Sequence, residues 1–417
     1  MRVDWHATPL AHWLLLAALV LLPFGAAPEL PVLIGAVAGI AALLRGRIDW
    51  HAPTVRCALV FGLAYWLPQL FSALDSVVPE KTWREVALDL RFVPFLLYVA
   101  NARCDARAAH VLVGGIAMVS LLWCADALIQ AATGFSVGGA ATSDRLSGIF
   151  GADNLKLGGV LAVLVPFVLS AAWRRGGAWA LALATGVLLV VILLAGARAA
   201  WFGFALGAAL VFWQILGRRR ALLALLALSM GTIIAGIAGY ASSERFSQRV
   251  DRTAAALAGD GDAIDHALSG RLPIWDIAWQ MGQTHPINGV GVRGFRYAYP
   301  DYAAPDDPFL HAEGERGAFH AHQIVLELWS ETGLLGLICW LAATGFGVAA
   351  WRAMPMASRT IAQPASIALV VALFPLNTHY AVYSAFWGLL MMWLLAVWLA
   401  LCASSATSPP SSKAPAT

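Results

Sequence analysis

Long apolar segments separated by short polar turns make up most of this chain. About twelve of them approach the roughly 20 residues that a helix needs to cross a bilayer. They lie at residues 10–27, 29–45, 55–74, 84–101, 108–131, 155–173, 177–196, 198–217, 220–241, 322–350, 360–378 and 381–402. One long polar segment, residues 241–321, separates the ninth from the tenth. The pattern predicts an all-α polytopic membrane protein with about twelve transmembrane helices and one large loop outside the bilayer.

The composition supports the same class. Hydrophobic residues make up 60% of the chain and charged residues 12%, whereas soluble domains carry about 25% charged residues. The net charge of +3 is spread along the chain, so we expect membrane lipids and no nucleic acid as its surroundings. The five cysteines form no closely spaced pair, and we expect neither a disulfide framework nor a zinc site.

The basic residues of the short loops predict the orientation, because cytoplasmic loops are enriched in arginine and lysine. If the N-terminus is cytoplasmic, these residues all fall on that side: Arg45, Arg47, Arg56, Arg103, Arg107, Arg174, Arg175, Arg218, Arg219, Arg220, Arg352, Arg359 and Lys413. We therefore expect a bacterial inner-membrane protein with both termini in the cytoplasm. Residues 1–240 then form helices one to nine, 241–321 a periplasmic loop, 322–403 helices ten to twelve, and 404–417 a disordered cytoplasmic tail.

Charged residues of the apolar segments gather at their outer ends in this topology, while the inner half is nearly free of charge. Ionisable residues in membrane segments are costly and usually functional. A transporter usually keeps such groups near the midplane. The distribution therefore favours a chemical site at the outer membrane face, and the residues concerned are Asp89, Arg91, Asp126, Lys156, Arg198, Glu327 and Glu331.

Two arginines are candidates for binding an anion at this face. Arg198 begins the eighth segment among small residues, Gly196 to Ala200, which leave room for a ligand. Arg271 lies in the large loop at the start of a predicted amphipathic helix, whose Leu272, Trp275 and Trp279 share one face. Each arginine alone could equally be a helix-end anchor or a solvated loop residue.

Polar residues beside the later segments form a second group of candidates. His320 and His322 lie where the large loop re-enters the membrane, and on one helix they would differ by about 200° in direction. Either histidine could be an ordinary structural residue, and Glu327 and Glu331, one helical turn apart, could simply form a polar face at the mouth of the helix. The further candidates are Arg145, Asn154, Arg293, Gln323, His379 and Tyr380, of which Asn154 could simply cap a helix. Asp260 and Asp262 match a metal motif only formally, and we expect no metal.

The histidine segment resembles a known family. His322-Gln323, nine residues, Gly333, two residues and Gly336 match the signature H-[NSQ]-x9-G-x-x-[GTY] of bacterial O-antigen ligases. The segment RLSGIFGADN, residues 145–154, resembles the RxSGxFxxPN pattern of the wider ligase and polymerase superfamily, with Ala152-Asp153 in place of the usual proline-bearing pair. The resemblance in topology covers the whole chain.

The resemblance implies a membrane glycosyltransferase with a GT-C-like fold. Such an enzyme transfers a preassembled O-antigen glycan from undecaprenyl diphosphate to a sugar hydroxyl of the lipid A core on the periplasmic face, which completes lipopolysaccharide. The transfer is inverting, independent of metal and without a cofactor. In that reading His322 is the general base, and Arg198 and Arg271 bind the donor diphosphate.

Three other functions stay open. An O-antigen polymerase would use the same donor, and only the histidine motif favours the ligase. A protein O-oligosaccharyltransferase usually has a longer periplasmic C-terminal extension than the short tail after Ala403. A non-enzymatic flippase or transporter of lipid-linked sugars is disfavoured by the nearly uncharged inner half.

Overall fold

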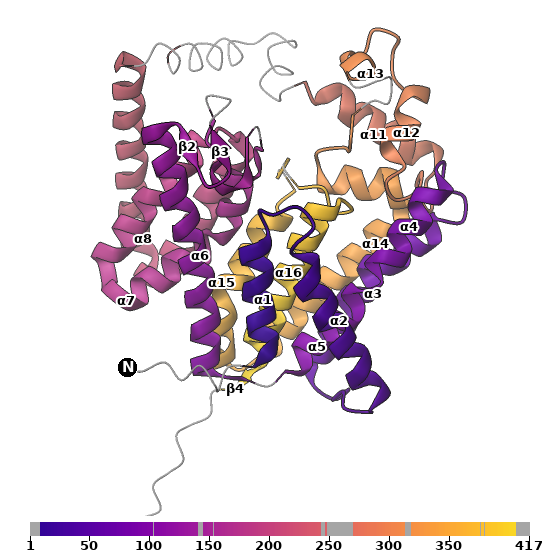
Figure 1. Cartoon of the computed structure of the whole chain (residues 1–417), viewed down its shortest axis with the longest axis horizontal. Coiled ribbons are helices and arrows are strands. Elements are labelled where there is room, and N and C mark those ends of the chain that lie inside the picture. Colours follow the sequence, from indigo (N-terminus) through magenta and orange to yellow (C-terminus); the bar gives the residue numbers. More distant parts are fainter. Residues whose placement is uncertain are drawn as a thin grey trace, which may run out of the picture.

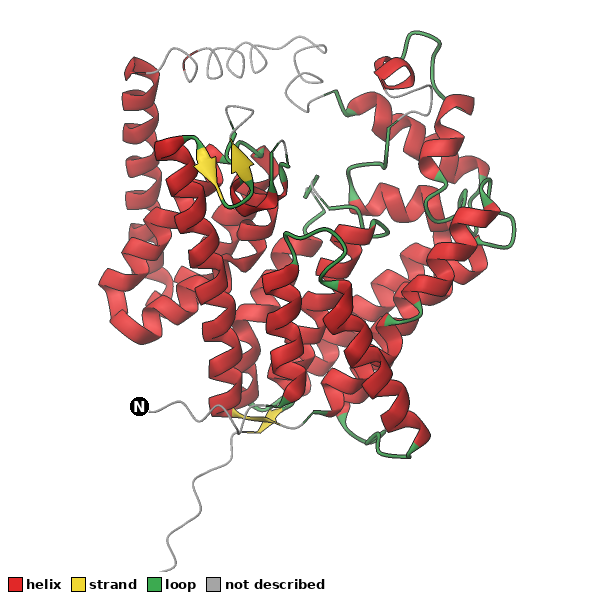
Figure 2. Cartoon of the chain, viewed as in Figure 1, coloured by secondary structure: helices red, strands yellow, loops and turns green. Residues whose placement is uncertain are grey.

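The computed structural model describes residues 9–102, 104–140, 145–152, 154–242, 247, 270–312, 318–375, 377–378 and 380–405. Helices form most of this part of the chain (Figures 1 and 2). The N-terminal group is α1 Leu10–Leu21, α2 Glu29–Leu44, α3 Pro53–Ser72, α4 Pro79–Asp89, α5 Phe92–Asn101 and α6 Ala106–Thr133. The later helices are α7 Lys156–Leu194, α8 Arg198–Ser242, α11 Leu272–Thr284, α12 Phe295–Ala298, α13 Pro308–Ala312, α14 Ile324–Ala353, α15 Met356–Leu373 and α16 Ala385–Cys402.

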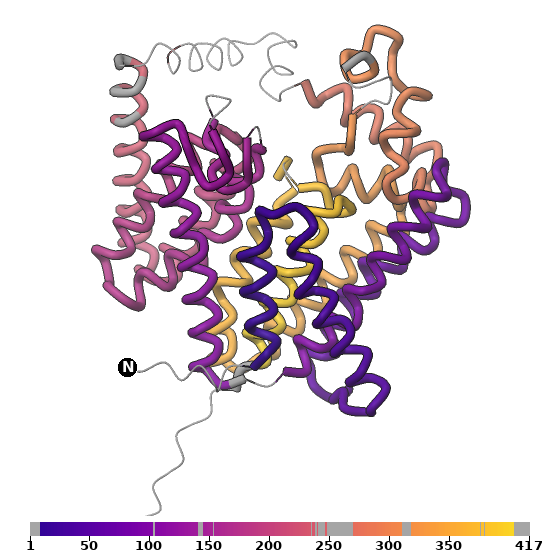
Figure 3. The backbone as a smooth tube through the Cα atoms, viewed as in Figure 1, coloured from indigo at the N-terminus to yellow at the C-terminus, as the bar shows by residue number. Residues whose placement is uncertain are grey.

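Short strands and 3₁₀ turns mark the two ends of the molecule. Strand β1, Cys104–Asp105, pairs in parallel with β4, Ser404–Ser405, and so joins the start of α6 to the end of α16. Strands β2, Phe135–Ser136, and β3, Gly139–Ala140, form a small antiparallel hairpin. The 3₁₀ turns are η2 Gly148–Phe150 and η3 Tyr299–Asp301. The β1–β4 pair and the α11–α13 region lie at opposite ends of the molecule (Figure 3).

The helices confirm a polytopic membrane protein. Among the described residues, seven helices are long and apolar enough to cross a bilayer, namely α3, α6, α7, α8, α14, α15 and α16, while α1 and α2 are apolar but shorter. Three of the seven contain a break, of which that in α14 is described below; α7 bends at Gly176 and Gly177, and α8 bends at Gly217. These bends fall where the sequence predicts one segment to end and the next to begin. The count of twelve crossings stays a prediction.

The predicted single segment 84–101 is wrong in detail. The amphipathic helix α4 ends at Asp89, and a separate helix α5 begins at Phe92. At about 1.5 Å per residue, the 10 residues of α5 reach only half of the roughly 30 Å hydrocarbon core. At the junction, Arg91 forms ion pairs with Asp89 at 2.9 Å and with Glu29 of α2 at 2.8 Å.

Helix α14 is also broken, at Gly333, whose φ is 62°. The loop before α12 provides hydrogen bonds on both sides of the break. The N–H groups of Val290 and Gly291 donate to the carbonyls of Ser330 and Glu331 at 2.8 and 3.1 Å. The carbonyls of residues 286 and 287 accept from the N–H groups of residues 334 and 335 at 2.8 and 3.1 Å. Irregular backbone at membrane depth needs such internal partners.

The core lies around two helices that are buried on nearly all sides. The first arm of α7 has every residue from Leu157 to Leu169 buried, and α16 is buried from Trp387 to Cys402 with the exception of Leu395. A helix that is apolar all round packs in the interior of a bundle. Because α16 is buried, its first residues hold the end of the preceding α15–α16 connection in place.

Candidate functional site

The connection between α15 and α16, residues 374–384, is the meeting point of the predicted site segments. The Nη1 group of Arg271 donates to the hydroxyl of Thr378 at 2.5 Å. The Nε2 group of Gln323 donates to the carbonyl of Pro375 at 3.1 Å. The loop before α11 and the loop before α14 thus both dock on the α15–α16 connection, although they are far apart in the sequence.

The two predicted anion-binding arginines are brought together. Arg198 is the first residue of α8, and Arg271 immediately precedes α11. Burial lowers the pKa of the Arg271 guanidinium, and the positive charge of Arg198 lowers it further. Two like charges that act on each other in this way repel each other in the absence of an anion. The pair therefore has the electrostatic character of a binding site for a strongly negative group.

The small residues around Arg198 have a different role from the predicted one. A Cβ atom on Gly158 of α7 would lie 3.1 Å from the Cβ of Ala195, and Ala197 and Ala200 lie just beyond it. All three alanines are buried. They allow the start of α8 to pack closely on the start of α7, which fixes the position of Arg198 rather than leaving space for a ligand.

The two histidines lie in the loop before α14, because the helix begins only at Ile324. The predicted difference of about 200° in direction, which assumes that both lie on one helix, is therefore wrong. The centroids of the two imidazole rings are 4.0 Å apart. His322 has a φ of 53°, in the left-handed region that non-glycine residues rarely adopt. Strained backbone of this kind is concentrated at functional sites.

Gln323 explains the second position of the histidine motif. Its Oε1 atom accepts from the N–H of Leu326 at 2.6 Å and so caps α14. Its Nε2 atom meanwhile makes the bond to the α15–α16 connection. The side chain that follows His322 therefore fixes both the start of the helix and the neighbouring connection.

Glu327 and Glu331 lie one turn apart in the first arm of α14 and are only 2% and 3% exposed. The carboxylate of Glu327 accepts from the N–H groups of Val382 and Tyr383 at 2.7 and 3.1 Å. Glu331 accepts from the N–H of Arg293 at 3.1 Å. Instead of forming a polar face at the mouth of a helix, the two carboxylates hold two loops against α14.

We expect Glu327→Gln to destabilise the protein and to slow its reaction. A glutamine can accept one of the two N–H bonds, but its amide NH₂ group then opposes the other, and an unsatisfied buried donor costs about 1–3 kcal/mol. Thermal unfolding of the purified protein and its turnover rate measure the effect. Glu80→Gln, on the exposed face of α4, is the matched control and should change neither. Unaltered stability in Glu327→Gln would show that the hydrogen bonds from Val382 and Tyr383 to this carboxylate do not hold the connection against α14.

Three of the remaining candidates, Arg145, Asn154 and Tyr380, have structural contacts. The side chain of Arg145 packs on Gly196, where an added Cβ would lie 3.1 Å from its Cδ. Asn154 donates to the carbonyl of Phe150 at 3.1 Å and accepts from the N–H of Lys156 at 3.3 Å, as at a helix start. The buried hydroxyl of Tyr380 donates to the carbonyl of Gly159 at 3.2 Å. His379, Asp260 and Asp262 lie outside the described residues.

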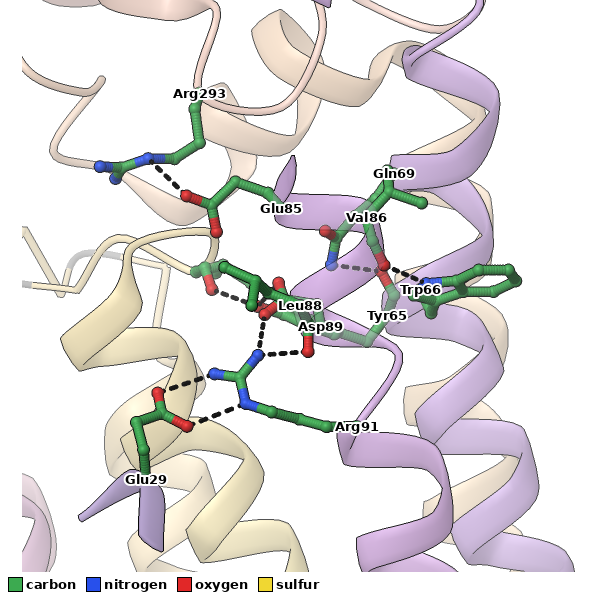
Figure 4. A network of polar contacts seen from close by, with 11 residues as sticks. Glu29, Tyr65, Trp66, Gln69, Glu85, Val86, Leu88, Asp89, Arg91 and Arg293 are labelled. Atoms are coloured by element: carbon green, nitrogen blue, oxygen red, sulfur yellow. Dashed lines mark hydrogen bonds and ion pairs between the residues drawn. The ribbon is translucent and has the colours of Figure 1, made fainter. Parts of the chain in front are cut away.

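A polar network beside the α15–α16 connection was not predicted from the sequence (Figure 4). Arg91 lies between Glu29 and Asp89, and Arg293 faces Glu85 at 3.7 Å. The Tyr65 hydroxyl lies 3.1 Å from both the carboxylate of Asp89 and the carbonyl of Val382. Arg293 has a φ of 65°, and together with His322 it is one of two described non-glycine residues with a positive φ. The feature of the sequence that could have indicated this network is the charged residues at the outer ends of the apolar segments.

The comparison with protein families gives one match. Residues 183–341 match the family model described as O-antigen ligase. The matched segment runs from the second arm of α7 into α14, and it includes Arg198, Arg271, Arg293 and His322. No individual curated protein matches the chain. The match covers less than half of the chain, and together with the histidine motif it supports a relationship to the superfamily of O-antigen ligases and polymerases.

Proposed function

We propose that the protein is an O-antigen ligase. It transfers a preassembled glycan from undecaprenyl diphosphate to a sugar hydroxyl of the lipid A core at the periplasmic face of the inner membrane. The observation that carries the proposal is that Arg271 and the histidine loop both dock on the α15–α16 connection, with the charge of Arg198 acting on Arg271. Both arginines and the histidine loop belong to the segment that matches the O-antigen ligase family.

The arginine pair suits the departure of the donor's diphosphate. As the glycosidic bond breaks, negative charge develops on the leaving oxygen and must be stabilised. A guanidinium group can donate two parallel hydrogen bonds to a phosphate. Two such groups supply the positive charge that a divalent metal supplies in other glycosyltransferases, so the proposed reaction needs neither a metal nor a separate energy source.

His322 is proposed as the base that activates the acceptor. The acceptor oxygen bonds to the anomeric carbon while the bond from that carbon to the diphosphate breaks, and the hydroxyl proton passes to the imidazole. An imidazole suits this role because its ordinary pKa of about 6.5 lies near the working pH. One direct displacement inverts the anomeric centre and requires no covalent enzyme intermediate.

The proposed membrane arrangement has about twelve crossings, a GT-C-like fold and both termini in the cytoplasm. The positions of the arginine-rich short loops support it. The separation between the α11–α13 region and the β1–β4 pair, at opposite ends of the molecule, fits a periplasmic site and a cytoplasmic C-terminus.

The products of the purified protein test the function. The protein is incubated with glycan-loaded undecaprenyl diphosphate and lipid A core, and the products are separated by size and by lipid. Glycan attached to lipid A core is the expected result. Longer lipid-linked glycan without lipid A product would show a polymerase instead, and movement of the donor across a bilayer without any new glycosidic bond would show a flippase.

A further inference from the structure

A polar pocket of about 360 Å³ borders the end of the α15–α16 connection, at Tyr383 and Ser384. Its walls come from α4, from the segment around Arg293 and from the start of α16. Part of its lining is the network of Figure 4. Five cationic side chains and three carboxylates line it, namely Lys81, Arg84, Arg91, Arg293 and Arg296 with Glu29, Glu85 and Asp89. The pocket therefore carries two positive charges in excess.

The carboxylates offset only part of the positive charge. Arg91 is held by Glu29 and Asp89, and Arg293 faces Glu85. The other cations lie against rings or at the rim. Lys81 lies 4.9 Å from the ring centre of Tyr297, and Arg296 lies 4.0 Å from that of Phe319. Arg84 is exposed at the rim.

The pocket is distinct from the arginine pair but adjoins the same connection. Arg271 contacts the α15–α16 connection at Thr378, whereas the pocket contacts it at Tyr383 and Ser384. Phe319, which lines the pocket, immediately precedes His320 in the histidine loop. A molecule in this pocket would therefore contact Phe319, at the start of the histidine loop, and would not contact Arg198 or Arg271, which are not among the lining residues.

We propose that this pocket binds a phosphorylated sugar of the acceptor glycolipid and so directs the acceptor hydroxyl towards His322. A phosphate monoester carries about −1.5 to −2 charges at pH 7, which matches the excess of two positive charges in the lining. Arg84 and Lys81 bind the phosphate, and the rings of Tyr297 and Phe319 offer apolar faces to the sugar. The assignment rests on the proposed function, because it takes the second substrate to be a glycolipid.

Binding measurements on the full-length protein in detergent test the assignment. Three probes are compared: lipid A core with its phosphates, the same glycolipid after chemical dephosphorylation, and undecaprenyl diphosphate. The variants are Arg84→Gln and the double variant Lys81→Gln with Arg84→Gln. Arg45→Gln removes an exposed charge at the start of the α2–α3 loop, away from the pocket, and is the matched control.

We expect Arg84→Gln to weaken binding of the phosphorylated glycolipid about tenfold, as the loss of one charge-assisted hydrogen bond predicts, and the double variant to weaken it further. Binding of the dephosphorylated glycolipid and of undecaprenyl diphosphate should not change. Equal losses for both glycolipids, unaltered binding of the phosphorylated one, or a loss confined to undecaprenyl diphosphate would each overturn the assignment. Failure of the proposed function would appear separately, as the absence of glycan transfer by a native protein that shows the expected binding pattern.

Discussion

We expect His322→Asn to lower the rate of glycan transfer by about 10²–10⁴-fold, the usual contribution of a positioned general base. Asparagine tolerates the left-handed backbone better than most residues, so the φ of 53° at this position should be retained. Its amide cannot take up a proton near pH 7. Single-turnover transfer with saturating donor and acceptor measures the effect, and binding of undecaprenyl diphosphate should stay within a few-fold of native.

The neighbouring histidine supplies the control for this prediction. The ring of His320 lies 4.0 Å from that of His322, so its removal disturbs the same surroundings without removing the proposed base. His320→Asn should therefore retain most of the activity. If the two variants lost activity to the same extent, the assignment of the base to His322 alone would be wrong, and a well-folded His322→Asn protein with native activity would exclude it as the base.

Replacement of either diphosphate-binding arginine by lysine should also be severe. Arg271→Lys and Arg198→Lys keep the positive charge but lose the planar fork that bonds two phosphate oxygens at once. The loss of one charge-assisted hydrogen bond corresponds to about 10- to 100-fold in kcat/KM. Arg271→Lys also loses the guanidinium bond to Thr378, which orients the side chain.

The arginine variants are measured by transfer kinetics and by binding of undecaprenyl diphosphate. Arg218→Lys, an exposed arginine beside the bend of α8, is the matched control and should behave as native. Native kcat/KM in both site variants would show that a positive charge alone suffices at these positions. It would argue against bidentate hydrogen bonding of the arginines to the phosphate.

The general class of the fold could be predicted from the sequence because apolar length is a property of the chain itself. The bends of α7 at Gly176 and α8 at Gly217 fell at predicted boundaries. The break between α4 and α5 was missed, because an apolar count tolerates one arginine, and the ion pair of Arg91 with Glu29 joins residues far apart in the chain. The break of α14 at Gly333 was missed because its hydrogen-bond partners lie in another loop.

In the candidate site, too, features of the local sequence could be predicted, whereas contacts between distant parts of the chain could not. The motif spacing made His322 and Gln323 candidates. Arg198 and Glu327 became candidates because charged residues are unusual at the ends of apolar segments. The role of Glu327 could not be predicted, since its acceptor bonds to Val382 and Tyr383 depend on how the α15–α16 connection folds back on α14. The polar pocket around Arg91 was not predicted for a similar reason, because its lining residues come from α2, α3, α4, the segment around Arg293, the histidine loop and the start of α16.

The position of the donor diphosphate tests the central claim most directly. An experimental structure of the protein with undecaprenyl diphosphate bound would locate both phosphates. We expect the guanidinium groups of Arg198 and Arg271 both to lie within hydrogen-bonding distance of the diphosphate, with the His322 ring beside the phosphate that carries the glycan. A diphosphate bound instead in the pocket of Arg91 and Arg293, with Arg198 and Arg271 away from it, would contradict the account.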